Sequence, residues 1–87
     1  MVRLKHLRLD VLKPHHPSVI EFSKILAEQG ECRVRVMVLE MDEKTETLEV
    51  EIEGSNLDFD QIQSAISAIG ASLHSIDAVE VDSAKST

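Results

Sequence analysis

Apolar and polar residues alternate along four stretches of the chain, and a period of two predicts a β-strand with one buried face. In the first stretch Leu7, Leu9 and Val11 share a face, while mostly charged residues occupy the other. The polar segment DEKTE at residues 42–46 separates the second stretch from the third, which predicts a β-hairpin. The four strands are expected at residues 3–13, 32–41, 47–54 and 71–81, with a bulge near 75–77 where the alternation slips.

Two other stretches repeat apolar residues at helical spacing. Ser18, followed by Glu21, fits a capping box that begins a helix over about residues 18–29. Asp58 and Gln61 repeat this pattern at the start of a second helix. The element order is therefore β-α-β-β-α-β, and right-handed crossovers predict a ferredoxin-like sandwich of the α+β class. Its four antiparallel strands are expected in the order 4-1-3-2, with both helices on one face.

The length of 87 residues corresponds to one small domain, which we place at residues 1–82, with a frayed tail at 83–87. The chain has two Phe and no Trp or Tyr, so its core must be aliphatic. A domain of this size buries a modest core and is often marginal alone, which favours a homo-oligomer.

Charge is distributed unevenly along the chain, whose formal net charge is −7. Residues 1–39 hold seven basic residues against four acidic ones, and residues 40–87 hold two against twelve. Nucleic acids are poor partners for so acidic a chain, because binding them depends on neutralising phosphates. Cations, or a basic surface of another subunit, are better candidates.

The cysteine count and the hydropathy pattern bear on location. Cys32 is the single cysteine, so there is no disulfide framework within the chain and a reducing compartment is expected. The sequence contains no signal-peptide pattern and no stretch near the roughly 20 apolar residues of a membrane span. We therefore expect a cytoplasmic protein without a membrane partner.

Three separated segments resemble an archaeal family of small proteins catalogued as a domain of unknown function (number two hundred and eleven). The segments are LDVLKPHHP, SNLDFDQI and GASLHSIDAVEV, and the likeness covers about residues 4–81. The resemblance implies a ferredoxin-like fold, an archaeal cytoplasmic source and a homo-oligomer. It implies no known activity, so no catalytic residue follows from it.

The expected topology gathers four candidate ligands on the open sheet face, at the end of the sheet where the KPHHP loop lies: Asp10, Glu49, His74 and His15. Histidine with carboxylates suits zinc, while carboxylates alone suit calcium. A cation site is therefore one interpretation. The alternative is a surface ion pair between Asp10 and His74, with the histidines of KPHHP serving only to end a strand and enter a helix. A further alternative is a small metal-assisted enzyme in which Asp10 orients His74 as a general base.

The second strand is expected at the edge of the sheet, yet Met37, Leu39 and Met41 are expected to make its outward face apolar. A long apolar edge strand favours pairing with another chain. The alternative is cover by the protein's own tail, for which DSAKST is too polar.

The function that these patterns favour is a non-enzymatic oligomeric module that binds a cation or a small ligand at subunit interfaces. RNA binding on the open face is excluded, because that face lacks the aromatic platforms that such binding needs. No cofactor motif occurs, and a divalent cation is the one cofactor that the candidate ligands suggest.

Overall fold

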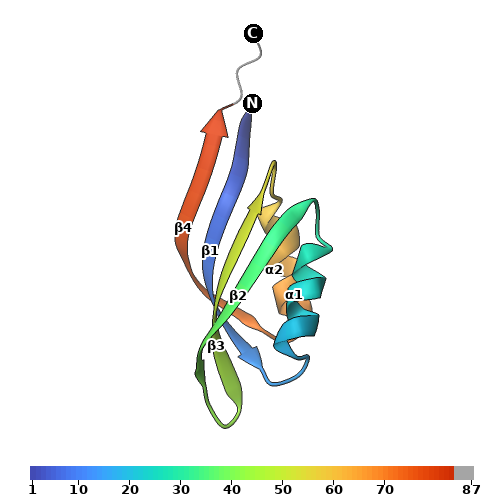
Figure 1. The fold of residues 1–87 in the computed structure, drawn as a ribbon, viewed down its shortest axis with the longest axis vertical. Coiled ribbons are helices and arrows are strands. Elements are labelled where there is room, and N and C mark those ends of the chain that lie inside the picture. The colour runs from blue at the N-terminus through green and yellow to red at the C-terminus, as the bar shows by residue number, and fades with distance from the viewer. Residues whose placement is uncertain (84–87) are drawn as a thin grey trace.

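The computed structural model describes residues 1–83 as one antiparallel sheet covered on one face by two helices (Figure 1). The elements are β1 (Val2–Pro14), α1 (Val19–Ala27), β2 (Cys32–Met41), β3 (Thr45–Gly54), α2 (Phe59–Ala68) and β4 (Ser72–Ser83). The strand order is β2-β3-β1-β4. This arrangement confirms the ferredoxin-like βαββαβ prediction. Of the predicted tail, Ser83 ends β4, and residues 84–87 lie outside the described residues.

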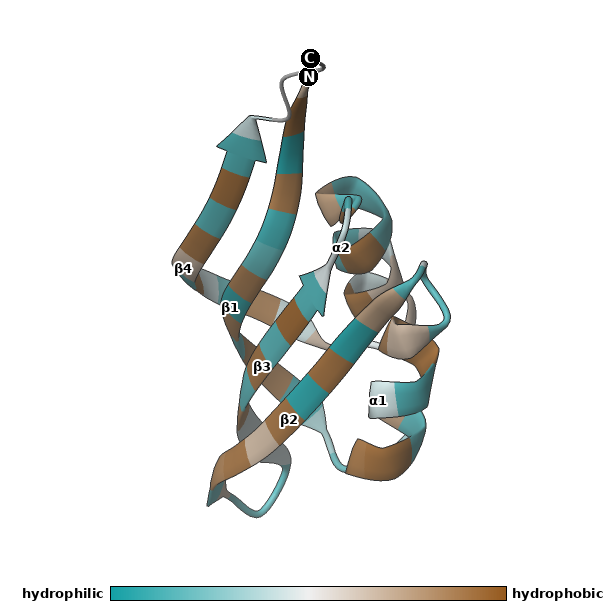
Figure 2. Cartoon of the chain, turned by 45° about the horizontal axis from the view of Figure 1, so that its top comes forward, coloured by the Kyte–Doolittle hydropathy of each residue, from teal (hydrophilic) through white to brown (hydrophobic). Residues whose placement is uncertain are grey.

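The core lies between the sheet and the helices. β1 and β3, the two central strands, each turn every second residue toward the helices, which appears as alternating bands in Figure 2. Phe22 and Leu26 of α1 and Ile62 and Ile66 of α2 meet these residues from the helical layer. The buried hydrophobic residues are Leu7, Leu9, Val11, Phe22, Leu26, Leu48, Val50, Ile52, Ile62, Ile66 and Ala71.

Both helices begin at the caps that the sequence predicts. The Glu21 amide donates to Ser18 Oγ at 3.2 Å, and the Gln61 amide donates to Asp58 Oδ1 at 3.1 Å. Each bond satisfies a backbone N–H that has no partner within its helix. After α2, Gly70 adopts φ +83°, a left-handed conformation in which glycine avoids the Cβ clash of other residues.

Three irregularities interrupt the pairing of β1 with β4. Arg8 pairs with Ala78 and Leu9 with Ile76, so Asp77 is an extra residue within the predicted bulge range. Further register shifts leave His74 and Lys5 without a direct partner. These shifts keep Leu73, Ile76 and Val79 on the helical side of the sheet despite the broken alternation.

Two expectations for the β2–β3 hairpin are wrong. β3 begins at Thr45 rather than after residue 46, so Glu46 belongs to the strand and is 5% exposed. A register shift at Leu39 also turns Met41 opposite Glu46, onto the helical side of the sheet. Met41 therefore does not share a face with Met37, because the extra residue reverses the alternation that the sequence suggests.

Candidate functional site

The open face of the sheet, away from the helices, carries the contact between Asp10 and His74. His74 Nδ1 lies 3.2 Å from Asp10 Oδ2, and the His74 side chain is 75% exposed. Both residues line a surface depression of about 310 Å³ together with Leu12 and Thr47. The bulge at His74 makes this contact possible, since the residue directly opposite Asp10 on β4 is Ser75. On the other side of β1, Asp10 lies opposite Glu49.

His15 lies elsewhere, against the β2–β3 hairpin. Its Nδ1 is 3.0 Å from Glu46 Oε2, and its Nε2 is 2.9 Å and 3.0 Å from the carbonyl oxygens of Asp42 and Glu43. Glu46 is in phase with the buried residues of β3, so it points to the helical side, opposite to Asp10. Of the four candidate ligands, the structure joins Asp10 to His74 and sets Glu49 beside Asp10, but it places His15 in another cluster.

Among the described residues, Asp10 and His74 are not part of a larger group of potential metal ligands. Within residues 1–83, no three or more His, Cys, Asp and Glu side chains are arranged to hold a metal ion. The Asp10–His74 pair therefore supplies two neighbouring ligands rather than a closed coordination shell.

A charge cluster of Lys13, Glu46 and His15, of which Lys13 and Glu46 are buried, is the feature that the sequence analysis missed. The Lys13 side chain is fully buried, and its Nζ lies 3.0 Å from Glu46 Oε1. The same ammonium donates to the carbonyl oxygens of Pro14, at 2.7 Å, and Pro17. It thus holds the loop before α1 against the end of the sheet. The sequence did contain a sign that Lys13 is buried. Lys13 continues the alternation of Leu7, Leu9 and Val11, so it lies on the same face of β1 as these core residues.

The protonation of this cluster follows from its contacts. The hydrogen bond to Glu46 raises the pKa of His15 above its usual value. His15 Nε2 faces two carbonyl oxygens, which only accept, so this nitrogen carries hydrogen; Nδ1 donates to Glu46 when the ring is charged. Burial opposes ionisation of Glu46, but the hydrogen bonds and charges of His15 and Lys13 outweigh it and lower the pKa of this carboxyl. These contacts therefore favour the charged forms of His15 and Glu46.

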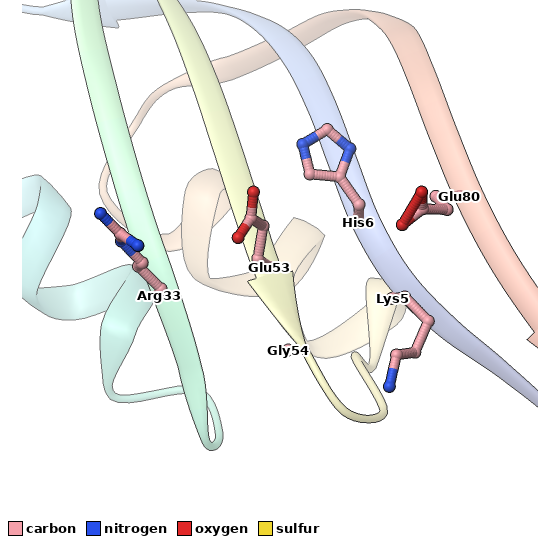
Figure 3. Close-up of a pocket in the computed structure, with 6 residues that line it drawn as sticks. All are labelled: Lys5, His6, Arg33, Glu53, Gly54 and Glu80. Carbon is pink, nitrogen blue, oxygen red and sulfur yellow. The ribbon is translucent and has the colours of Figure 1, made fainter.

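The end of the open face nearer the chain termini carries a row in which Arg33 and His6 alternate with glutamates. Arg33 of β2 lies opposite Glu53 of β3, Glu53 opposite His6 of β1, and His6 opposite Glu80 of β4. Figure 3 shows these four side chains around one shallow depression, together with Lys5. His6 Nε2 also lies 3.1 Å from Glu51 Oε2, and this contact lowers the pKa of the Glu51 carboxyl. The row runs from one edge strand to the other.

Both edge strands leave apolar side chains exposed. The β2 edge (Met37, Leu39 and Met41) is 42%, 56% and 61% exposed at these residues. The β4 edge (Ile76, Val79 and Val81) is 48%, 56% and 54% exposed.

Element length explains why the β4 edge lies uncovered. Helices of nine and ten residues extend about 14–15 Å at 1.5 Å per residue. Strands of 12 and 13 residues extend about 40 Å or more at 3.3 Å per residue. The helices are therefore too short to cover the β1–β4 end of the sheet, which extends past them in Figure 1.

Cys32, the lone thiol, belongs to the packing rather than to a reactive site. It packs against the core at the start of β2, and burial raises the pKa of its thiol. A raised pKa disfavours the nucleophilic thiolate. No helix within residues 1–83 is long and apolar enough to cross a membrane.

Order of elements, strand order and the one-sided helical layer together define a small ferredoxin-like α+β protein. The chain belongs to the family of domain of unknown function two hundred and eleven, described as uncharacterized ArCR, whose model matches residues 5–84. It is also similar to a curated protein of the archaeon Methanocaldococcus jannaschii that is named "Uncharacterized protein MJ0319". The two are 42% identical over 77 residues, which cover 87% of this chain and 79% of that protein. The resemblance noted from the three segments is thus confirmed.

Proposed function

We propose that this chain is a non-enzymatic subunit of a homo-oligomer, and that its assembly creates binding sites for a cation or a small ligand. The observation that carries this proposal is the exposure of apolar side chains along an edge strand. Unpaired backbone groups and apolar side chains together favour addition of a strand from another chain. The small core gives a further reason, since association buries the surface that an 87-residue domain leaves in water.

Asp10 and His74 support the cation part of the proposal. Imidazole with carboxylate is a ligand set that suits zinc, and Glu49 adds a carboxylate opposite Asp10. The pair lies on the open face and includes a residue of the edge strand β4, so the proposal assigns the remaining ligands to a neighbouring subunit or to solvent. The alternative, a metal-assisted enzyme using the same pair, has less support. Its general base would be an imidazole that is 75% exposed, with little shielding from water.

The test of assembly is the mass in solution by light scattering. We expect a defined multiple of 9.7 kDa, which falls when Met37→Lys and Leu39→Lys are introduced together. The double variant Gln63→Lys/Ser67→Lys adds the same charge to exposed positions of α2 and should leave the mass unchanged. A monomeric wild type would refute the proposal.

The test of cation binding is titration with zinc and with calcium after removal of metal by chelator. We expect binding, measured by calorimetry, that is lost in His74→Ala and retained in His16→Ala, a histidine away from the pair. The absence of heat with both metals, or equal binding by the two variants, would remove the cation part and leave assembly standing.

A further inference from the structure

We infer that copies of this chain associate head to tail, with the β4 edge of one copy along the β2 edge of the next, so that the sheet continues between subunits. This inference rests on the proposed homo-oligomer and names the surfaces that form it. Four observations carry it: strand direction, the apolar rows, the charge row and the coverage of both edges.

Strand direction permits this junction without turning the second copy over. β1 is antiparallel to both β3 and β4, and β2 is antiparallel to β3. β2 and β4, the two edge strands, therefore run in opposite directions. A second copy in the same orientation places its β2 antiparallel to β4 of the first, and the helices of both copies cover the same face of the shared sheet.

Valines of β2 that face the helices lie at the same level of the sheet as the apolar residues of the β4 edge. Leu9 pairs with Ile76 on one side and with Val50 on the other, and Val50 pairs with Val36. Hence Ile76 at one edge and Val36 at the other belong to one row across the sheet.

The next apolar row repeats this match. Leu7 connects Val79 to Ile52, and Ile52 pairs with Val34. In an unstaggered junction, Ile76 and Val79 therefore meet Val36 and Val34 of the next copy. Met37 of the next copy lies further along the same junction, at the level of Ser75.

Charges on the open face match in the same register. The row described above ends with the guanidinium of Arg33 on β2 and with the carboxylate of Glu80 on β4. In the unstaggered junction Glu80 lies beside Arg33 of the next copy, so the alternation continues. Opposite charges directly across neighbouring strands stabilise the pairing.

Pairing of like edges fits less well. A twofold β4–β4 junction gathers Asp77, Glu80 and Asp82 from both copies along one boundary. A twofold β2–β2 junction leaves the β4 edge exposed. Head-to-tail contact covers both edges of every copy in a closed ring, and of every copy except the two terminal ones in an open filament. The twist between neighbouring strands turns such a series into a ring or a helical filament.

The experiment mixes two variants that each lack one edge. One variant carries Met37→Lys and Leu39→Lys on the β2 edge, and the other carries Ile76→Lys and Val79→Lys on the β4 edge. All four residues are exposed, and far-UV circular dichroism confirms that each variant folds. Light scattering then measures the mass of each variant alone and of the equimolar mixture. Head-to-tail assembly predicts that each variant alone is monomeric, while the mixture forms a dimer of about twice 9.7 kDa through its one intact junction.

Three outcomes would overturn the inference. If the β4 variant keeps the mass of the wild type, the junction uses other surfaces, although the proposed homo-oligomer stands. If both variants are monomeric and the mixture stays so, the two edges do not pair with each other. If the wild type itself is monomeric, the proposed function fails together with the inference.

Discussion

Removing the counter-charge of Lys13 should destabilise the fold severely. Glu46→Ala leaves the ammonium, which is fully buried, without the carboxylate 3.0 Å away. Breaking a buried pair in this way costs about 3–5 kcal/mol, because one charge remains in the low-dielectric interior. The carbonyls of Pro14 and Pro17 still accept from Nζ, so we expect the lower value, about 3 kcal/mol. That is a large part of the roughly 4–13 kcal/mol expected for a domain of this length.

The measurement is urea unfolding followed by far-UV circular dichroism, since the chain has no Trp or Tyr to report by fluorescence. All variants are compared at one protein concentration, because association adds to apparent stability. In thermal unfolding, a loss of about 3 kcal/mol corresponds to about 12–24 °C in the melting temperature.

The double variant Lys13→Met/Glu46→Leu tests the cause. It removes both charges and keeps similar side-chain volumes, so it should be more stable than Glu46→Ala alone. The reasoning is refuted if Glu46→Ala costs less than about 1 kcal/mol, the range of exposed ion pairs, since Lys13 would then be solvated. It is also refuted if the double variant is the less stable of the two.

Two further predictions concern pH and backbone packing. His15 has a raised pKa, so its contribution is fully present below its unfolded value of about 6.5 and is lost as the pH rises through the folded value. The urea midpoint should therefore fall as the pH rises above about 6.5, and His15→Gln should reduce this slope; an unchanged slope would contradict the role of the His15–Glu46 contact. Glu46 has the opposite sign: its pKa is lowered, so its contribution is present above its unfolded value and is lost in acid as the pH falls through the folded one. Gly54→Ala would place a Cβ 2.9 Å from the Glu31 carbonyl oxygen and 2.7 Å from Leu57 Cδ2, and this overpacking should cost about 1–3 kcal/mol in urea unfolding. Gly30→Ala is the matched control, because its Cβ meets nothing within 4 Å and should change stability by less than about 0.5 kcal/mol; equal effects of the two variants would contradict the steric argument.

The parts of the fold that depend on local periodicity could be predicted from the sequence. Leu7, Leu9 and Val11 identify the buried face of β1 because a strand alternates its side chains regardless of what surrounds it. Ser18 and Asp58 identify the helix starts because each cap bonds an amide only three residues away. Such short-range rules depend on neighbours in the chain.

Features that depend on residues far apart in the sequence could not be predicted from local patterns. Glu46 resembles a solvated hairpin residue until Lys13, 33 positions earlier, is known to face it across the sheet. The bulge at Leu39 likewise leaves no local mark, yet it separates Met41 from Met37. The exposure of the β4 edge reflects how far the helices extend over the strands. The contact of Asp10 with His74 was anticipated from the expected pairing of β1 with β4, although a bulge, rather than direct opposition, brings it about.

The position of β1 in the sheet sets a constraint on when the chain can fold during synthesis. β1 is synthesised before both of its partners, β3 and β4, and β4 ends at Ser83. At roughly 5–20 residues per second, the interval between completion of β1 and completion of β4 is about 4–14 s. During this time β1 lacks one of its two neighbours. The sheet can therefore be completed only after β4 has been synthesised. α1 and the β2–β3 hairpin, which need only nearby segments, are the parts able to form first.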